Sequence, residues 1–255
     1  MPALIEIPLR LERHPNAMPT ARQLHGAVSA ALQGHPESVL SAWPLLVGAE
    51  DETRLQLRLG WKSEELPPDS LTQVDRRWRI GEGRSSDLIA WSGRAHIEWI
   101  SFDEIVRVPP VNEVILHVAS PSLFRSTGYQ EFKRRIPLPD PERIYRRLLG
   151  EWNRFATRFP VPEEHLNEFL RCIELVDWEP AMGELAFDRS GSGGESLVKG
   201  FLGDVRIGLR GPRPAGSASL LTSASLFAQV AGVGHWTNRG FGACTVTLSD
   251  NSQCL

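Results

Sequence analysis

Several residue types are scarce in this sequence, and each shortage excludes a class of protein. Cysteine occurs only three times in 255 residues, with no C-x-x-C spacing, which argues against a structural zinc site, a redox pair or a disulfide scaffold. No run approaches the roughly 18 consecutive apolar residues of a membrane-spanning helix, so no membrane contact is expected. The opening residues lack a basic stretch followed by an apolar one, so we expect no secretory signal and predict a cytoplasmic protein.

Lysine is as scarce as cysteine, which gives the basic residues an unusual composition. Three of the 28 basic residues are lysine and the others are arginine, and the formal net charge is −3. Arginine grips phosphate groups through a planar fork and stacks on bases, which lysine does not do. The arginines gather at 76–79 and at 125–154, so a local basic surface could attract a polyanion despite the acidic total. A GC-rich coding sequence is an alternative cause of the bias.

Segments with the patterns of strands and helices alternate in both halves of the chain. The patterns predict strands at 3–11, 52–61, 76–80, 87–91, 95–100, 112–119 and 243–248, and helices at 20–32, 140–155, 162–173 and 220–231. Pro109 and Pro110 form a stiff break between the halves. We therefore predict an N-terminal domain at 1–108, a C-terminal domain at 111–255, and an α+β fold of antiparallel sheets with helices on one face.

The first predicted helix has a defined start and carries a histidine beside its apolar stripe. Thr20 and Gln23 have the spacing of a capping box, in which each side chain covers a backbone N–H group of the other residue. Leu24 and Val28 begin the apolar stripe, and His25 lies about 100° round the helix from Leu24. The imidazole is therefore expected at the edge of the buried face, where it either packs against a neighbour or faces a ligand.

A glycine-rich segment, GVGHWTNRGFG at 232–242, follows the last predicted helix and precedes the last predicted strand. Glycine permits close backbone approach and presents N–H groups to phosphate oxygens, and the other side chains add donors and a stacking surface. The segment has neither the P-loop pattern nor the strand-to-helix setting of a Rossmann fingerprint. Its candidate binding residues are Gly232, Gly234, His235, Trp236, Asn238, Arg239, Gly240 and Gly242. Alternatively, the glycines serve a tight turn without a ligand.

Together with three other motifs, the glycine-rich segment resembles the CRISPR repeat-processing endoribonucleases of the RAMP superfamily. The other motifs are VASPSLF at 118–124 followed by Gly128, IPLPDP at 136–141, and KGFLGDV at 199–205. The N-terminal half is similar to this family mainly in layout. The resemblance implies two tandem ferredoxin-like, RRM-related domains, and metal-independent cleavage of precursor CRISPR RNA within each repeat to give mature guide RNA.

The reaction that the resemblance implies needs no cofactor. The 2′-hydroxyl of the RNA attacks the adjacent phosphate and leaves a 2′,3′-cyclic phosphate and a 5′-hydroxyl, so the protein must move two protons and stabilise a charged phosphorane. Histidine suits this task because its ordinary pKa is about 6.5. No cluster of acidic residues and histidines in the sequence has metal-ligand spacing, so no metal site is expected. The implied partners are CRISPR repeat RNA, other subunits of a CRISPR effector complex, and a second copy of the chain in a homodimer.

The resemblance suggests two histidines for catalysis. Members of the family often carry a catalytic or RNA-contacting histidine on the first helix, where this sequence has His25. Other members place the histidine in the following loop, which here contains His35, although Trp43 aligns nearer to that position. His25 is our first candidate and His35 the second.

The partners of the histidine depart from the pattern of some family members, which add a tyrosine and a lysine. Residues 1–128 contain no tyrosine and only one lysine, Lys62. Arg22 lies three residues before His25 on nearly the same helix face. Arg22 is therefore our candidate for stabilising the phosphorane, and a solvated arginine at a helix start is the alternative.

Four arginines near the helix predicted at 140–155 are candidates for gripping the RNA backbone or the groove of a repeat stem. They are Arg134, Arg135, Arg143 and Arg147. A solvated arginine face is the alternative. Two other function classes also stay open: a RAMP protein that binds repeat RNA without cutting it, and a small-molecule enzyme on a ferredoxin-like scaffold.

Overall fold

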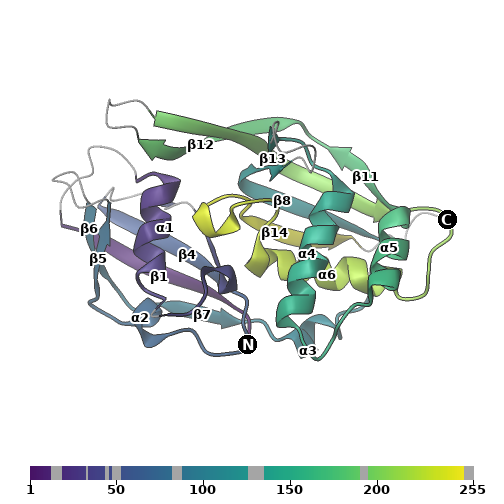
Figure 1. The fold of residues 1–255 in the computed structure, drawn as a ribbon, viewed down its shortest axis with the longest axis horizontal. Helices are drawn as coiled ribbons and strands as arrows, with labels where there is room; N and C mark the ends of the chain where they lie inside the picture. Colours follow the sequence, from purple (N-terminus) through teal and green to yellow (C-terminus); the bar gives the residue numbers. More distant parts are fainter. Residues whose placement is uncertain are drawn as a thin grey trace.

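The computed structural model describes residues 1–12, 19–32, 34–43, 46–47, 53–81, 88–125, 135–189 and 195–249. In these ranges the chain builds two large antiparallel sheets, each with helices packed against it (Figure 1). One sheet comes from the N-terminal half and the other from the C-terminal half. The boundary predicted at Pro109 and Pro110 stays a prediction.

The N-terminal sheet has the strand order β2-β4-β1-β6-β5, with β3 paired to β4 and β7 paired to β1. Its strands are β1 (Ala3–Leu11), β2 (Leu40–Ala42), β3 (Leu46–Val47), β4 (Arg54–Trp61), β5 (Arg77–Ile80), β6 (Leu88–Ser92) and β7 (His96–Trp99). The helices of this half are α1 (Ala21–Ser29), the 3-10 turn η1 (Glu37–Val39), α2 (Asp69–Thr72) and α3 (Phe102–Ile105).

The C-terminal sheet has the order β11-β13-β8-β14, with β12 paired to β13. Its strands are β8 (Glu113–Ser122), β11 (Ile173–Trp178), β12 (Ala181–Arg189), β13 (Glu195–Leu209) and β14 (Cys244–Ser249), and β9 (Phe124–Arg125) pairs with β10 (Arg135–Ile136). The helices are α4 (Pro141–Phe155), α5 (Glu163–Cys172), α6 (Ser217–Ala231) and the 3-10 turn η2 (Thr237–Arg239).

Each half forms a β-α-β-β-α-β unit, and in its sheet the first strand of the unit lies between the third and the fourth. This strand order is the ferredoxin-like arrangement. In the C-terminal sheet the first strand is β8, flanked by β13 and β14, and in the N-terminal sheet it is β1, flanked by β4 and β6. The prediction of tandem ferredoxin-like sheets is thus confirmed. The N-terminal unit departs from the pattern in one respect, because its second helix is reduced to α2, a single turn of four residues.

The first helix is capped as the sequence predicts but ends earlier. The backbone N–H of Gln23 donates to the Thr20 hydroxyl, and the Thr20 N–H donates to the Gln23 side chain, so the capping box is present. Leu24 and Val28 are buried against the N-terminal sheet. The helix ends at Ser29 rather than at residue 32. The N–H groups of Ala31 and Leu32 bond three residues back instead of four and tighten the chain into a turn.

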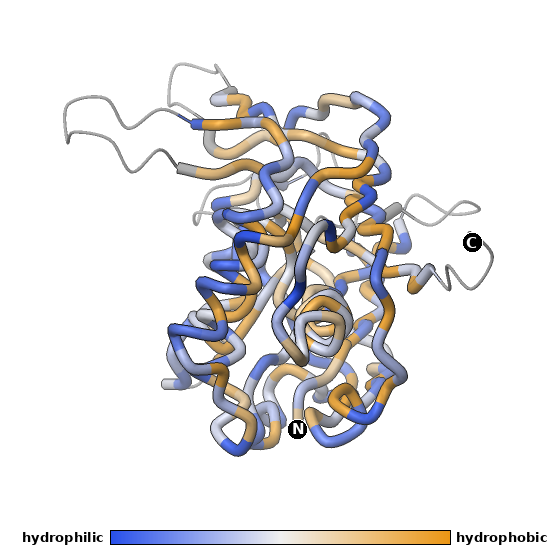
Figure 2. The backbone as a smooth tube through the Cα atoms, turned by 90° about the vertical axis from the view of Figure 1, so that its right-hand side faces the viewer, coloured by the Kyte–Doolittle hydropathy of each residue, from blue (hydrophilic) through white to orange (hydrophobic). Residues whose placement is uncertain are grey.

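Each sheet carries a separate hydrophobic core, and Figure 2 shows the hydrophobic segments running through the inside of the molecule. Phe155, the last residue of α4, packs against both cores. The hairpin formed by β12 and β13 extends from the C-terminal sheet and contacts α1 (Figure 1). The two halves therefore meet through side chains and not only through the connecting chain.

A glycine on β4 tests the contact between the halves. A Cβ atom at Gly60 would lie 1.9 Å from the backbone oxygen of Val230 on α6. Gly60→Ala should therefore lower the free energy of unfolding by about 1–3 kcal/mol, as overpacking does, measured by urea denaturation. Gly150→Ala on α4 is the matched control: nothing lies within 4 Å of its added Cβ, so it should raise stability by about 0.5–1 kcal/mol. Equal stability of Gly60→Ala and the wild type would contradict this packing.

Candidate functional site

The end of α6 and the start of the glycine-rich segment lie against the edge of the N-terminal sheet. The Ser41 hydroxyl on β2 donates to the backbone oxygen of Ala231 at 2.8 Å and lies 3.4 Å from the Thr237 hydroxyl. Ser41 is paired across the sheet with Gly60, whose missing side chain admits the end of α6. Two small residues on neighbouring strands thus allow the close approach of the two halves.

A group of three charged residues, one buried and two partly buried, spans the same seam. Lys62, which follows β4, is 2% exposed, and its ammonium group donates to Glu151 on α4 at 2.8 Å. Arg147, one helical turn before Glu151, donates to the other Glu151 oxygen at 2.8 Å. The same guanidinium donates to the Gly232 backbone oxygen at 3.1 Å and to the Thr237 hydroxyl at 2.9 Å. These charges tie the base of the glycine-rich segment to both halves.

Each charge in this cluster depends on the others. Burial lowers the pKa of the Lys62 ammonium below its ordinary 10.5, although the Glu151 carboxylate opposes the shift. Burial acts to raise the pKa of Glu151, but the positive charges of Arg147 and Lys62 outweigh it and hold that pKa below its ordinary 4.5. Glu151 is therefore ionised at neutral pH and supplies the counter-charge to both cations.

The glycines of this segment serve close packing. Gly232, Gly234, Gly240 and Gly242 all have positive φ angles, between 66° and 92°. A Cβ at Gly242 would lie 1.7 Å from the backbone oxygen of Val233, and one at Gly234 would lie 2.4 Å from the Ser122 hydroxyl. The close packing at Gly234 and Gly242 agrees with the interpretation that these glycines serve a tight turn.

Several N–H groups of the segment already donate to protein carbonyl oxygens. Those of His235 and Gly242 bond to Leu123 and Pro121, and that of Arg239 bonds to Trp236. A cradle built from these N–H groups is therefore not present in this conformation. The side chains of the segment are the better candidates for contact with a phosphate.

Trp236 and Arg239 pack against the β12–β13 hairpin. The Trp236 ring lies 4.9 Å from the Phe187 ring and 5.7 Å from the Phe241 ring, centroid to centroid. The Arg239 guanidinium lies 5.5 Å from the Phe187 centroid, and that of Arg135 lies 5.1 Å from the Trp236 centroid. This aromatic cluster places two arginines beside the glycine-rich segment.

His25 reaches the glycine-rich segment from α1. Its Nδ1 atom lies 3.0 Å from the backbone oxygen of Asn238, and its Nε2 atom lies 3.1 Å from a carboxylate oxygen of Glu37. Both neighbours are acceptors, so both contacts are hydrogen bonds when each ring nitrogen carries a proton. The side chain is 13% exposed, whereas Glu37 is 51% exposed. The histidine is thus held in place and the carboxylate lies at the surface.

The other candidates of the N-terminal half lie in different surroundings. His35 Nδ1 is 3.9 Å from Glu65, and its ring meets Trp61 edge-on at 5.4 Å. Trp43 is buried under the Arg58 guanidinium, 4.6 Å from its ring centroid. Arg22 is exposed near the start of α1, on the same helix as His25. Of the two candidate histidines, His25 is the one whose ring bonds to the glycine-rich segment.

The arginines near α4 divide between surface and seam. Arg143 is 34% exposed and paired with Asp140 at the helix start, and Arg135 is exposed beside Trp236. Arg147 is committed to the seam described above. Arg134 lies outside the described residues. Arg135 and Arg143 are therefore the members of this set that lie at the described surface.

Sequence reasoning missed the residues that hold the site together: Glu37, Ser41 and Glu151. In the sequence, Lys62 stands out only as the single lysine of residues 1–128. A signal for Glu151 did exist, since it follows Arg147 by four residues, the spacing of a helix ion pair. Its contact with Lys62 joins positions 89 residues apart, which no local pattern encodes.

No group of three or more His, Cys, Asp or Glu side chains is placed to hold a metal ion in the described ranges. No helix among them combines the length and apolar character needed to cross a membrane.

Replacing Glu151 should reveal the charge cluster in the pH dependence of stability. A carboxyl whose pKa is lower in the folded than in the unfolded protein stabilises the fold above its unfolded pKa, and that contribution disappears as the pH falls through the folded value. Wild-type stability should therefore fall below pH 4.5, the ordinary value for Glu151, and Glu151→Gln should show a shallower fall.

At neutral pH, Glu151→Gln should cost about 3–5 kcal/mol, because Lys62 then lacks a buried counter-charge. The measurement is urea unfolding at a series of pH values. Glu142→Gln is the control, since its ion pair with Arg146 is exposed and worth at most about 0.5 kcal/mol. Identical acid limbs for the wild type and Glu151→Gln would contradict the assigned role.

Comparison with protein families matches residues 116–244 to the family described as CRISPR-associated endoribonuclease Cas6. No curated protein matches the sequence. Among solved structures, one Cas6 product complex is 19% identical to this chain, with a TM-score of 0.75 over 97% of this chain and 100% of that one. Another structure of the same Cas6 names Thermus thermophilus as its organism. A second Cas6 product complex is 20% identical, with a TM-score of 0.73 over 96% and 99%.

A Cas6-related protein from Pyrococcus furiosus is 14% identical, with a TM-score of 0.60 over 97% of this chain and 99% of that one. At these identities the structural likeness concerns the fold. The family match covers about half of the chain, including α4, the β12–β13 hairpin, α6 and the glycine-rich segment. The chain belongs to the Cas6 family of CRISPR-associated endoribonucleases.

Proposed function

We propose that this protein cleaves precursor CRISPR RNA within the repeat, without a metal ion, to release mature guide RNA. The observation that carries the proposal is the contact between His25 on α1 and the backbone of Asn238. It brings the candidate proton-transfer group of the N-terminal half to the glycine-rich segment of the C-terminal half. The description of the family as CRISPR-associated endoribonucleases supports RNA as the substrate.

The reaction is an internal transfer of the phosphate ester. The 2′-oxygen forms a bond to phosphorus, the bond from phosphorus to the 5′-oxygen breaks, and the products are a 2′,3′-cyclic phosphate and a 5′-hydroxyl. The 2′-hydroxyl gives one proton to a water molecule of the solvent, and the leaving 5′-oxygen takes one from the protein. The chain therefore needs a proton donor beside the leaving oxygen and a positive charge beside the phosphate.

The surroundings of His25 suit the role of proton donor. Nδ1–H donates to the Asn238 oxygen and fixes the ring orientation, while Nε2–H faces the Glu37 carboxylate. Because Glu37 is half exposed, an RNA phosphate can take its place at Nε2. The proton at Nε2 then passes to the leaving 5′-oxygen.

Arginines next to this histidine are the candidates for stabilising the phosphorane. Arg22 is on the same helix, and Arg239 follows Asn238 directly in η2. Guanidinium groups form paired hydrogen bonds to phosphate oxygens. Arg135 and Arg143 extend the basic surface along the C-terminal half, where they would hold the RNA backbone.

Binding of CRISPR repeat RNA without cleavage is the second candidate function. It is favoured by the low exposure of His25 and by the acceptors that occupy both of its ring nitrogens. If Glu37 keeps its place when RNA binds, the proton on Nε2 never reaches the leaving oxygen. Incubation of the protein with repeat RNA in EDTA separates the two functions, since only the nuclease yields fragments.

His25→Ala tests the catalytic role. General acid catalysis by one side chain is typically worth about 10²–10⁴-fold in rate, so single-turnover cleavage should slow by roughly that factor. RNA affinity should fall far less, because many phosphate contacts share the binding. His35→Ala is the control. A wild-type rate for His25→Ala with a slow His35→Ala would move the role to His35, and wild-type rates for both would exclude proton transfer by either histidine.

Arg239→Ala tests the RNA path along the glycine-rich segment. Loss of one phosphate contact should weaken binding across RNA sequences and reduce the slope of log affinity against log salt by about 0.7–0.9. Arg158→Ala is the control, because Arg158 is exposed and paired with Asp103, outside this segment. An unchanged slope for Arg239→Ala would remove the side chain from the RNA path.

A further inference from the structure

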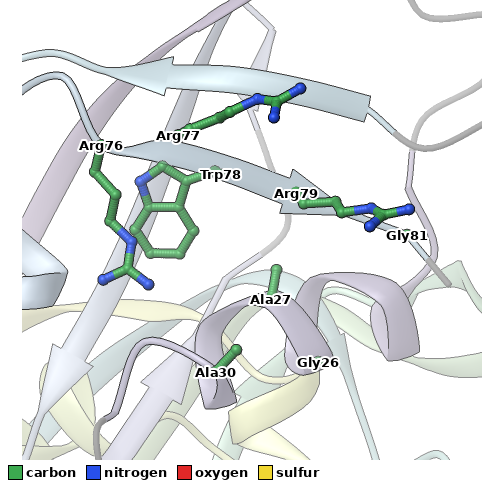
Figure 3. A pocket seen from close by; sticks show the side chains of 8 residues that line it. All are labelled: Gly26, Ala27, Ala30, Arg76, Arg77, Trp78, Arg79 and Gly81. Atoms are coloured by element: carbon green, nitrogen blue, oxygen red, sulfur yellow. The ribbon is translucent and has the colours of Figure 1, made fainter. Parts of the chain in front are cut away.

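A cleft between α1 and β5 lies apart from the proposed cleavage residues. It has a volume of about 470 Å³ and is lined by Gly26, Ala27, Ala30, Arg76, Arg77, Trp78, Arg79 and Gly81. Figure 3 shows α1 on one side of the cleft and β5 on the other. Neither His25 nor a residue of the glycine-rich segment is among the lining residues. The arginines at 76–79 therefore line a cleft that takes no part in the proposed cleavage chemistry.

The β5 side of the cleft is basic. Arg76 turns toward α1 beside the Trp78 ring, and Arg79 extends along the end of the strand (Figure 3). The Arg76 guanidinium lies 5.0 Å from the Trp78 centroid and donates to the Ser70 backbone oxygen. This bond takes one of its five N–H donors. No acidic residue lines the cleft within the described part of the chain.

Trp78, on the same wall of the cleft, has a buried indole N–H group. The residue is 2% exposed, and its indole N–H meets no hydrogen-bond acceptor in the described ranges. A buried donor without an acceptor is uncommon in folded proteins. An anionic oxygen held between Arg76 and Trp78 would supply the acceptor that this N–H group lacks.

The opposite wall consists of small residues of α1. Gly26, Ala27 and Ala30 leave this side of the helix without long side chains, and a Cβ atom at Gly26 would meet nothing within 4 Å. Gly26 directly follows His25, so the two positions lie about 100° apart around the helix. His25 faces the glycine-rich segment on one flank of α1, and the cleft lies toward β5 on another. The helix surface at Gly26, which carries no side chain, lies between the His25 flank of α1 and the cleft.

We propose that the cleft binds the phosphodiester backbone of a single-stranded RNA segment flanking the cleaved bond, and that this segment crosses α1 at Gly26. The planar fork of an arginine side chain matches phosphate oxygens. A strand can approach a helix surface closely where no side chain projects, and Gly26 provides that surface. The inference rests on the proposed function, because it takes the segment beside His25 to be RNA.

The test measures binding of repeat RNA made resistant to cleavage by a 2′-deoxy nucleotide at the scissile position, with and without its single-stranded flanks. Arg79→Ala should weaken binding of the flanked RNA by roughly tenfold and reduce the salt slope by about 0.7. It should leave binding of the RNA without flanks unchanged. Arg77→Ala is the matched control, because the Arg77 side chain points away from α1 (Figure 3) and lies 3.8 Å from Glu12.

Gly26 provides a second variant that does not depend on charge. Gly26→Ala should keep RNA affinity and stabilise the fold, whereas Gly26→Met should weaken binding of the flanked RNA only, because its side chain blocks the crossing. A thermal melt of each variant shows that the fold is kept. Equal affinity of the wild type, Arg79→Ala and Gly26→Met for the flanked RNA would overturn the proposal. Competition by polyglutamate as strong as that by single-stranded RNA would instead assign the cleft to an acidic protein partner and would also overturn it.

The same experiment separates this inference from the proposed function. Unmodified repeat RNA is incubated with the wild type in parallel. Binding with the expected differences but without cleavage would overturn the nuclease and support the cleft. Cleavage with no difference between the variants would support the nuclease and overturn the cleft.

Discussion

The arrangement of the site depends on one partly buried carboxylate, that of Glu151, which lies between Lys62 and Arg147. A charge removed from water is tolerated only when opposite charges and hydrogen bonds replace the solvent. Lys62 comes from the N-terminal half, and Arg147 carries the interaction to Gly232 and Thr237. The position of the glycine-rich segment relative to α1 therefore follows from an electrostatic requirement of the seam.

Local patterns in the sequence predict the parts of the fold that local physics decides. The alternation of β1, the capping box at Thr20 and the proline-started helix at Pro141 were all predictable, because each depends on residues a few positions apart. Short elements such as β2, α2 and α3 were not predicted, since three or four residues carry too little periodicity. Their conformation is set by the sheet edge or core on which they lie.

The candidate site was predictable by residue type more than by arrangement. His25 follows from its helix position, and the glycine-rich segment follows from its composition. The segment proved to use several N–H groups for its own turn, and Trp236 proved to pack in an aromatic cluster. The partners of His25 come from η1 and η2, which lie far apart in sequence. Such contacts need the packed fold and leave no trace in local spacing.

Phe155 packs against the cores of both halves, only four residues after Glu151, whose carboxylate pairs with Lys62. Unfolding of either half would therefore expose apolar surface of the other core to water. It would also break the ion pair between Lys62 and Glu151. Multi-domain chains commonly melt in separate steps when their domains share only a linker or a wet interface. Here the shared side chains couple the halves, so we expect them to unfold as a single cooperative unit with equal calorimetric and van't Hoff enthalpies.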